Sequence, residues 1–287
     1  MPVSYLDNLV GVFGFPVAEN PTCIMQNAAF SAAKLDNWRY VTLEVRPENL
    51  PAAIQGLRAM GFRGINLTIP HKIAVMPLLD EVRSDARMIG AVNTLYIDGY
   101  GLLVGENTDG KGFLRGLRED AKVDPKGKRI VILGAGGAAR AIAVELALAG
   151  ARRITVVNRS EDRGFDMVRD LMSQTIVKAD FVDLGEGFCV RGDVDILVNA
   201  TPVGLYPQVS EMPLVTLDSA RPDLLVCDAV PNPPETRLIA TARGMGLRVL
   251  SGLSMLVYQG AIGFEMWTGQ KPGEGVMKQA LAAAFAP

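Results

Sequence analysis

One lysine and one aspartate in the first half of the chain are candidates for moving a proton. Lys72 closes the run Asn66–Lys72, and Asp109 lies within Asn107–Gly110. Oxidation of a secondary alcohol by hydride transfer requires removal of the hydroxyl proton, and the reverse reaction requires a proton donor. A lysine held by a carboxylate can fill either role, because the carboxylate orients the ammonium group. Each residue alone also fits a structural interpretation, with Lys72 capping a helix or in solvent and Asp109 as a helix N-cap.

Uncharged hydrogen-bonding residues accompany both candidates. They occur in three segments that have apolar strand character and polar ends, namely Asn66–Lys72, Gly90–Thr94 and Gly105–Gly110. Parallel strands of α/β domains place ligands at their carboxyl ends. Asparagine and threonine at such ends suit a polyhydroxylated substrate, because both donate and accept hydrogen bonds.

No metal-binding pattern is present. His71 is the only histidine, which excludes a histidine-based triad or a multi-histidine metal site, and its place after Pro70 at a helix start favours a structural role. Cys23, Cys189 and Cys227 are far apart and lack metal-ligand spacing. We therefore predict no metal and interpret the cysteines as small buried thiols in a reducing, cytoplasmic compartment.

A glycine-rich segment in the second half suggests a nucleotide. The apolar run Arg129–Leu133 is followed by Gly134, Gly136 and Gly137, then Ala138 and Ala139, and then a helical pattern. This strand, turn and helix match the dinucleotide fingerprint with its last glycine replaced by alanine, in which the backbone and the helix N–H groups face a pyrophosphate. The alternative is a glycine-rich turn that binds no ligand.

The residues after the next predicted strand favour NADP over NAD. NAD enzymes usually place an acidic residue there, whereas this chain has Asn158, Arg159 and Ser160, with Arg163 three residues later. Two guanidinium groups match the charge and geometry of a 2′-phosphate. An exposed helix start, with Ser160 as N-cap and the arginines in solvent, is the structural alternative.

Short apolar runs alternate with longer helical patterns along the whole chain, which predicts an α/β fold with mainly parallel sheets. The predicted strands are Val10–Phe15, Tyr40–Val45, Gly64–Thr68, Arg129–Leu133, Arg153–Val157, Asp195–Asn199, Leu224–Asp228 and Leu247–Leu250. The predicted helices are Pro47–Met60, Lys111–Arg118, Gly137–Ala149, Asp162–Met172, Leu253–Thr268 and Glu274–Phe285. Residues Asp98–Gly101 between two apolar runs predict a hairpin. We place the crossover between two domains near residues 107–110.

Charge and hydropathy exclude several classes of function. The formal net charge is -2 and no run rich in lysine and arginine occurs, so we expect no nucleic-acid partner and no anionic membrane surface. The N-terminus lacks the pattern of a signal peptide. The most apolar long stretch, Ile130–Ala151, contains Arg140 and Glu145, which argues against a membrane-spanning helix.

Seven segments, in their order and spacing, resemble the shikimate dehydrogenase family over nearly the whole chain. They are Asn66–Lys72, Gly90–Thr94, Asn107–Gly110, Gly134–Ala139, Asn158–Ser160, Asn199–Gly204 and Leu256–Ala261. The resemblance implies reversible, NADPH-dependent reduction of 3-dehydroshikimate to shikimate in aromatic amino-acid biosynthesis. It also implies a substrate domain of residues 1–107, completed by residues 251–287, and a Rossmann-type doubly wound NADP-binding domain of residues 108–250, with the active site in the cleft between them.

The resemblance assigns roles by position. Lys72 and Asp109 match the family's catalytic pair. The substrate contacts correspond to Asn66, Thr68, Asn93 and Gln259. The cofactor contacts correspond to Gly134, Gly136, Gly137 and Ala138 in the glycine loop, Thr201, Pro202 and Val203 beside the nicotinamide, and Asn158, Arg159, Ser160 and Arg163 around the adenosine phosphate.

Two departures from the family concern the substrate. The family holds the substrate carboxylate with Ser-x-Ser or Ser-x-Thr, where this chain offers Asn20 and Thr22 next to Glu19. Pro231 replaces a tyrosine that follows the fifth strand of the nucleotide domain. We therefore expect a small cyclic hydroxy acid as substrate and keep three alternatives, namely shikimate, quinate or an analogue, and a dinucleotide-binding sensor without turnover. A monomer and a homodimer both fit the sequence.

Overall fold

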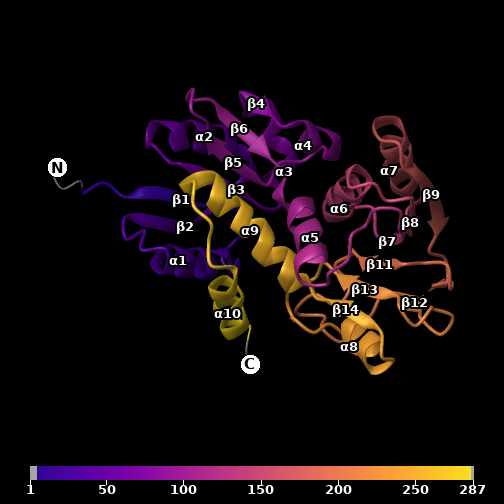
Figure 1. Ribbon diagram of the computed structural model, residues 1–287. Helices are drawn as coiled ribbons and strands as arrows, with labels where there is room; N and C mark the ends of the chain where they lie inside the picture. Colours follow the sequence, from indigo (N-terminus) through magenta and orange to yellow (C-terminus); the bar gives the residue numbers. More distant parts are fainter. Residues whose placement is uncertain (1–4, 286–287) are drawn as a thin grey trace. The chain divides into compact units, whose positions relative to one another are not determined.

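The computed structural model describes residues 5–285, which belong to two compact units (Figure 1). One unit combines the residues up to Thr108 with those from Gln259 onward, and the other spans Asp109–Tyr258. Helix α9 (Gly252–Thr268) crosses the second point of division. Each unit is built around its own six-stranded sheet.

The first unit has a mixed sheet in the order β2-β1-β3-β5-β6-β4 (Figure 1). Strand β1 runs parallel to β2 and β3, while β5 is antiparallel to β3 and β6. Its strands are β1 (Asn8–Gly14), β2 (Trp38–Glu44), β3 (Gly64–Leu67), β4 (Glu81–Val82), β5 (Thr94–Ile97) and β6 (Leu103–Glu106). Strands β5 and β6 form the predicted hairpin, which Asp98 stabilises by accepting hydrogen bonds from the N–H groups of Tyr100 and Leu102, each at 2.9 Å.

The two faces of this sheet differ in chemistry. Ile65 and Leu67 on β3 pack on one face with Leu50 and Ile54 of α2 in an apolar core. Side chains alternate along a strand, so Asn66 lies on the opposite face. The helices of the unit are α1 (Thr22–Ala32), α2 (Leu50–Ala59), α3 (His71–Ala74), α4 (Ser84–Ile89) and α10 (Glu274–Ala284), with 3₁₀ turns at Pro47–Asn49 and Met76–Leu78.

The C-terminal part of α9 belongs to the first unit and packs on the Asn66 face. Trp267 on α9 donates through Nε1 to the Leu95 carbonyl oxygen of β5 at 2.9 Å. Phe264 stacks on Phe30 of α1 with ring centroids 5.0 Å apart, and both rings are buried. Burial of each such side chain contributes roughly 1.5–3 kcal/mol, so these contacts fix the return of the chain to the first unit.

The second unit has a parallel sheet in the order β14-β13-β11-β7-β8-β9 (Figure 1). Its strands are β7 (Arg129–Leu133), β8 (Arg153–Asn158), β9 (Lys178–Asp183), β11 (Ile196–Asn199), β13 (Leu225–Asp228) and β14 (Arg248–Leu250). The strand order reverses between β7 and β11, and doubly wound sheets bind ligands at the carboxyl ends of the strands at this point.

The connections in the second unit are of two kinds. Helices α6 (Gly137–Leu148) and α7 (Glu161–Gln174) link β7, β8 and β9, and α8 (Arg237–Gly244) links β13 to β14. The chain passes from β9 to β11, and from β11 to β13, through the short strands β10 (Phe188–Cys189) and β12 (Val215–Thr216). Val190, Val215 and Leu217 of these connections are buried against the sheet and close the core where a helix would otherwise lie.

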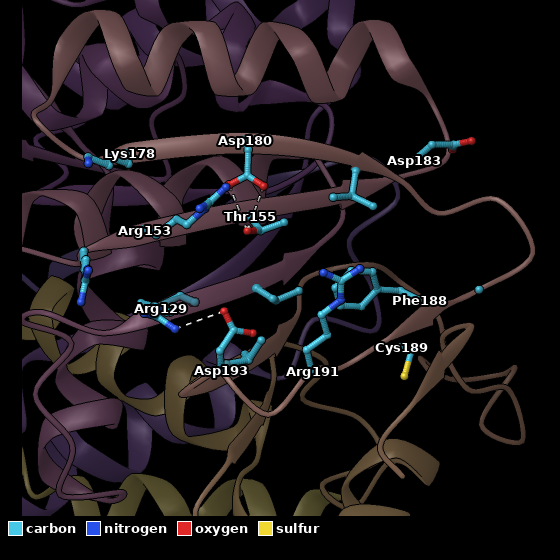
Figure 2. Close-up of a pocket in the computed structure, with 16 residues that line it drawn as sticks. Arg129, Arg153, Thr155, Lys178, Asp180, Asp183, Phe188, Cys189, Arg191 and Asp193 are labelled. Carbon is cyan, nitrogen blue, oxygen red and sulfur yellow. Dashed lines mark hydrogen bonds and ion pairs between the residues drawn. The ribbon is translucent and has the colours of Figure 1, made fainter. Parts of the chain in front are cut away.

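A groove of about 610 Å³ lies beside β7, β8 and β9, next to the connection that carries β10 (Figure 2). Four of its charged side chains form two ion pairs. Arg153 donates to the Asp180 carboxylate at 2.7 Å, Thr155 donates to the same carboxylate at 3.1 Å, and Arg129 pairs with Asp193 at 3.1 Å. None of the predicted catalytic, substrate or cofactor residues lines this groove.

The predicted fold class and all the predicted strands and helices are confirmed, with ends that shift by up to a few residues. The predicted helix at Lys111–Arg118 begins earlier, because α5 spans Thr108–Glu119. The pattern did not identify α1, α4, α8 or β9, nor the two-residue strands β4, β10 and β12. The expectation of buried thiols is right for Cys227 only, since Cys23 is half-buried and Cys189 is exposed on the short strand β10. Among residues 5–285, no helix is long and apolar enough to cross a membrane.

Candidate active site

A network of uncharged polar side chains is buried in the first unit. It consists of Asn66 on β3, Asn93 just before β5, Thr94 at the start of β5, Thr108 at the start of α5 and Gln259 on α9. None of them is more than 8% exposed. The backbone N–H of Thr108 donates to Asn93 Oδ1 at 2.7 Å, and Asn93 Nδ2 donates to Thr108 Oγ1 at 3.1 Å. Thr108 Oγ1 also lies 3.0 Å from Thr94 Oγ1 and 3.4 Å from Gln259 Oε1. Three predicted substrate residues thus share one network.

Three hydrogen bonds fix the amide of Asn66. The Tyr40 hydroxyl donates to Asn66 Oδ1 at 2.8 Å, and Asn66 Nδ2 donates to the Asn93 carbonyl oxygen at 3.2 Å and to Thr94 Oγ1 at 2.9 Å. Burial raises the pKa of the Tyr40 phenol well above its usual range, so the hydroxyl remains protonated and acts as donor. With both Nδ2 hydrogens engaged, Asn66 offers a ligand the second lone pair of Oδ1.

Thr68 follows β3 and lies against the end of β1. A Cβ atom at Gly14 would come within 2.4 Å of the Thr68 methyl group, so this close approach requires glycine. The N–H of Thr68 donates to the Phe13 carbonyl oxygen at 3.0 Å. Thr68 is half-buried, and its backbone is tied to the carboxyl end of β1.

Lys72 is half-buried on the short helix α3. Its carbonyl oxygen accepts a hydrogen bond from the N–H of Val92 at 2.8 Å, which connects α3 to the residue before Asn93. The adjacent His71 is fully buried, and its Nε2 lies 2.7 Å from the Val45 carbonyl oxygen. The predicted structural role of His71 is therefore supported, because this contact anchors the start of α3.

Asp109 is half-buried in the first turn of α5. The helix begins at Thr108, so the alternative in which Asp109 is the N-cap is wrong. The preceding residue, Thr108, is fixed by its bonds to Asn93. The position of the Asp109 backbone is therefore set by the buried network.

Asn20 and Thr22 form a local turn at the start of α1. Asn20 Oδ1 accepts a hydrogen bond from the N–H of Thr22 at 3.0 Å, which leaves the Asn20 amide nitrogen as the group that could donate to a ligand. Thr22 is buried, whereas Glu19 is exposed. The exposure of Glu19 reduces its influence on any anion near Asn20, because solvent screens an exposed charge.

The glycine loop joins β7 to α6. Gly134 has a φ of +105°, and a Cβ atom there would lie 3.0 Å from the Ala200 carbonyl oxygen, so both conformation and space favour glycine. Gly136 and Gly137 are exposed, and Gly136 is the N-cap of α6 without a side-chain capping bond. The first N–H groups of the helix are thus available to an anion, while the half-buried Ala138 precedes the buried Ala139.

The turn from β8 to α7 carries the predicted phosphate contacts. Asn158 Nδ2 donates to the Ser160 carbonyl oxygen at 2.9 Å and thereby shapes the turn. Ser160 occupies the N-cap position of α7, but its hydroxyl makes no capping bond. Glu161 and Asp162 follow in the first turn and are exposed.

Arg159 and Arg163 are exposed, and neither guanidinium has a hydrogen-bond or ion-pair partner within residues 5–285. Arg169 on the same helix differs, because it pairs with Asp166 at 2.8 Å. Two unpaired cations beside a helix start suit the dianionic 2′-phosphate of NADP.

Asn199, the last residue of β11, forms hydrogen bonds with the loop that follows the strand. Asn199 Oδ1 accepts hydrogen bonds from the N–H of Thr201 at 3.1 Å and from Thr201 Oγ1 at 2.7 Å. Asn199 Nδ2 donates to Asp228 Oδ1 at 3.0 Å and lies 3.4 Å from the Val203 carbonyl oxygen. Pro202 is exposed at the tip of this loop. Across the described chain, no cluster of three or more His, Cys, Asp or Glu residues is suited to hold a metal ion.

Comparison with known proteins supports the resemblance seen in the sequence. Residues 12–95 match the model of the shikimate dehydrogenase substrate binding domain, residues 117–232 that of shikimate / quinate 5-dehydrogenase, and residues 252–282 that of the shikimate 5'-dehydrogenase C-terminal domain. The shikimate dehydrogenase (NADP(+)) of Methanopyrus kandleri is 48% identical over 276 residues, which cover 96% of this chain and 94% of that protein. The chain belongs to the shikimate dehydrogenase family.

Two solved structures of relatives are also similar. The ligand-free form of 5-ketofructose reductase from Gluconobacter sp. strain CHM43 has a TM-score of 0.94 and 42% identity, covering 98% of this chain and 100% of that chain. A shikimate dehydrogenase in complex with NADP+ has a TM-score of 0.90 and 41% identity, covering 98% and 96%. Solved structures similar to this chain therefore include proteins whose names state different substrates.

Several members of the observed networks were not assigned a role from the sequence. Thr94 and Thr108 lie in the polar segments that were singled out, but they were not named as substrate contacts. Tyr40, which bonds to Asn66, and Asp228, which bonds to Asn199, lie outside those segments. A signal existed for Asp228, because it is a charged residue at the carboxyl end of a predicted buried strand. No such signal existed for Tyr40, whose type fits an ordinary half-buried strand.

Proposed function

We propose that the chain catalyses reversible hydride transfer between NADP(H) and a carbonyl carbon of a small cyclic polyhydroxylated compound, with 3-dehydroshikimate and shikimate as the expected pair. The buried network around Asn66, Asn93 and Gln259 carries the proposal. It is uncharged and already hydrogen-bonded internally, so it recognises a ligand with hydroxyl groups through its remaining lone pairs and donors.

Lys72 transfers the proton, assisted by Asp109. In the reducing direction the ammonium group of Lys72 donates a proton to the oxygen that becomes the hydroxyl, and in the oxidising direction the neutral amine takes it back. Asp109 orients the amine and stabilises its charged form. Thr68 and the Asn66 and Asn93 amides orient the substrate ring, so that the reacting carbon is fixed relative to the amine.

NADP supplies the hydride when bound, and the second unit supplies its contacts. The N–H groups beside Gly136 and Gly137 suit the pyrophosphate, and Arg159 and Arg163 suit the 2′-phosphate, with Asn158 and Ser160 beside them. Thr201, Pro202 and Val203 would lie beside the nicotinamide, with Gly134 and Ala138 completing the glycine loop. We propose residues 1–107 with 251–287 as the substrate domain and 108–250 as the nucleotide domain.

Reduction of a keto sugar is a second candidate function, and Asn20 is the observation that favours it. The family's paired serines offer two hydroxyl groups to a carboxylate. In this chain Asn20 has its oxygen tied to the Thr22 N–H and offers an amide NH2, which can only donate, beside the Thr22 hydroxyl. Such a group suits a neutral hydroxyl or carbonyl as well as an acid. The high similarity to the 5-ketofructose reductase structure supports the same alternative.

Initial rates separate these candidates. NADP+ reduction is measured with saturating shikimate and then quinate, and NADPH oxidation with 3-dehydroshikimate and then 5-ketofructose. Fast turnover of the shikimate pair supports the first proposal, and fast turnover of 5-ketofructose alone replaces it with the second. NADP+ binding without turnover of any of them contradicts both and favours a sensor.

The double substitution Asn20→Ser with Thr22→Ser tests the substrate side directly. If Asn20 redirects the pocket from a carboxylate, the double variant gains kcat/KM for shikimate by roughly tenfold, which is the value of one added hydrogen bond to a charged group. An unchanged ratio of shikimate to keto-sugar activity assigns selectivity to other residues. A cytoplasmic location and a monomeric or homodimeric state complete the proposal, and sedimentation would determine the latter.

A further inference from the structure

Asp228 joins two loops at the carboxyl edge of the second unit's sheet. It ends β13 and is 1% exposed. Its Oδ1 accepts hydrogen bonds from Asn199 Nδ2 at 3.0 Å and from the N–H of Val230 at 2.9 Å, and its Oδ2 accepts one from Thr236 Oγ1 at 2.6 Å. One carboxylate therefore holds the end of β11 and both ends of the segment that connects β13 to α8.

The bond to Asp228 determines how Asn199 faces the cofactor loop. An amide has distinct donor and acceptor ends, and a carboxylate can only accept, so Asn199 must direct Nδ2 to Asp228 and Oδ1 to Thr201. Thr201 in turn lies against the glycine loop. A Cβ atom at Gly134 would come within 3.1 Å of Thr201 Cγ2.

We propose that Asp228 is a positioning residue for the cofactor, which fixes the amide of Asn199 and thereby holds the loop Ala200–Gly204 against the glycine loop. This inference rests on the proposed function only for the placement of the nicotinamide beside Thr201–Val203. Asp228 is not among the cofactor residues predicted from the sequence. Loss of its carboxylate should weaken NADP binding, although Asp228 itself does not touch the cofactor.

The charge state of Asp228 matters to this role. Burial raises the pKa of the Asp228 carboxyl to about 6, against the opposing effect of the hydrogen bonds from Thr236, Val230 and Asn199. The ionised carboxylate satisfies all three donors. Protonation of Oδ2 would reverse the contact with Thr236, whose hydroxyl would then accept instead of donating. It would also weaken the hydrogen bonds from Asn199 and Val230 to Oδ1, because a neutral carboxyl is a poorer acceptor than a carboxylate.

The other titratable groups near Asp228 do not pair with its carboxylate among the described residues. They are Cys227 beside it on β13, Arg248 on β14, and Glu235 and Arg237 around the start of α8. Burial, with a smaller effect of Asp228, raises the pKa of the Cys227 thiol, so it stays neutral. Glu235 is exposed and pairs with Arg243. Titration of Asp228 itself is therefore the expected cause of a change in this network near pH 6.

The test is calorimetric titration of NADP+ into the full chain, compared between the natural protein, Asp228→Asn and Asp228→Ala from about pH 5 to pH 7.5. Asparagine at this position is neutral at every pH, keeps an oxygen toward Asn199 and turns an NH2 toward Thr236, so it imitates the protonated acid. The 2′-phosphate of NADP+ also titrates near pH 6. The informative quantity is therefore the ratio of the natural protein's Kd to that of Asp228→Asn.

We expect this ratio to be near one at about pH 5 and to fall several-fold as the pH rises through 6. We also expect Asp228→Ala to bind NADP+ about tenfold more weakly than the natural protein at pH 7.5, which corresponds to one lost hydrogen-bonded contact. A ratio that stays constant with pH would overturn the proposal. Binding by a folded Asp228→Ala equal to that of the natural protein would overturn it as well.

Asp195→Asn is the matched control. Asp195 lies at the opposite, amino edge of the same sheet, where it accepts a hydrogen bond from the N–H of Arg129 at 2.8 Å and pairs with Arg221 at 2.9 Å. A merely structural role for Asp228 would make the two variants alike, with lower stability and an unchanged Kd for NADP+. Because the readout is cofactor binding, it remains valid whichever substrate the enzyme turns over.

Discussion

The substrate side of the first unit and the cofactor side of the second unit satisfy their polar groups in opposite ways. Asn66 and Asn93 are buried, and their amides are engaged by neighbouring side chains and backbone. Gly136, Arg159 and Arg163 are exposed, and the two arginines have no partner within the described residues. The polar groups of the first unit are therefore satisfied within the protein, whereas the exposed groups of the second unit are available to bind an anion.

This difference predicts different consequences of mutation. A buried network that loses one member leaves its partner unsatisfied, which lowers stability together with substrate recognition. Removal of an exposed, unpaired cation costs little stability and acts on affinity alone. The network around Asp228 is the buried part of the cofactor side, so it is expected to behave as the substrate side does.

The largest effect is expected for Lys72→Ala. Loss of the proton donor should lower kcat on the order of 10²–10⁴-fold, because general acid–base catalysis contributes about that much, while the Kd for NADP+ stays nearly unchanged. Initial rates and calorimetry measure the two quantities. Lys178→Ala, an exposed lysine beside the groove of the second unit, is the control and should leave both unchanged. Near-normal turnover by Lys72→Ala would refute the assigned role.

The double variant Arg159→Ala with Arg163→Ala tests the cofactor side. We expect KM for NADP+ to rise roughly ten- to a hundredfold, since a hydrogen bond to a charged group contributes about 1.5–3 kcal/mol. KM for NAD+, which lacks the 2′-phosphate, and the denaturation midpoint should not change. Arg169→Ala on the same helix removes a paired cation and serves as the control. Equal losses for NADP+ and NAD+ would show that these arginines do not read the phosphate.

Tyr40→Phe tests the substrate side. Removal of the hydroxyl leaves Asn66 Oδ1 without its donor in a buried position, which should cost about 1–3 kcal/mol of unfolding free energy and raise the substrate KM. Chemical denaturation measures the first effect. Tyr96→Phe on β5 is the control, because the Tyr96 hydroxyl accepts from Arg83 near the surface, so its loss should have a smaller effect. Equal losses of unfolding free energy for the two variants would contradict a stabilising role of the buried hydrogen bond between Tyr40 and Asn66.

The two sides also differ in how well the sequence predicts them. Arg159, Arg163 and the glycines of residues 134–137 belong to short contiguous motifs. The sequence alone is therefore enough to predict that they lie at the starts of helices α6 and α7. Asn66 and Asn93 were predicted because polar residues at strand ends suggest a ligand. Their partners could not be predicted, because the bond from Tyr40 to Asn66 depends on the register between β2, β1 and β3. Register is a tertiary property, and a tyrosine within a strand pattern reads equally well as an apolar core residue.

Similar reasons explain the elements that the pattern missed. Strand β9 lies at the edge of its sheet, and its residues from Lys178 to Asp183 are only half-buried or exposed, so the apolar alternation that marks a strand is weak. Helix α1 begins at Thr22, the last residue of the polar segment from Pro16 to Thr22, which has no helical periodicity. In both cases the neighbouring elements, rather than local composition, determine the structure.

The smallest effect is expected for Asp180→Asn in the groove of the second unit. This variant tests whether burial or the number of hydrogen bonds determines how much a polar group contributes to stability. Asp180 accepts from Arg153 at 2.7 Å and from Thr155 at 3.1 Å, so it has nearly as many partners as Asn66, but the paired side chains are 54% and 33% exposed (Figure 2). Solvent screens such a pair, and its contribution is about 0–1 kcal/mol and decreases with salt. Denaturation at low and high salt should show a loss smaller than that of Tyr40→Phe, with NADP+ binding unchanged. A loss as large as that of Tyr40→Phe would mean that partner number, rather than burial, distinguishes the substrate network from the surface.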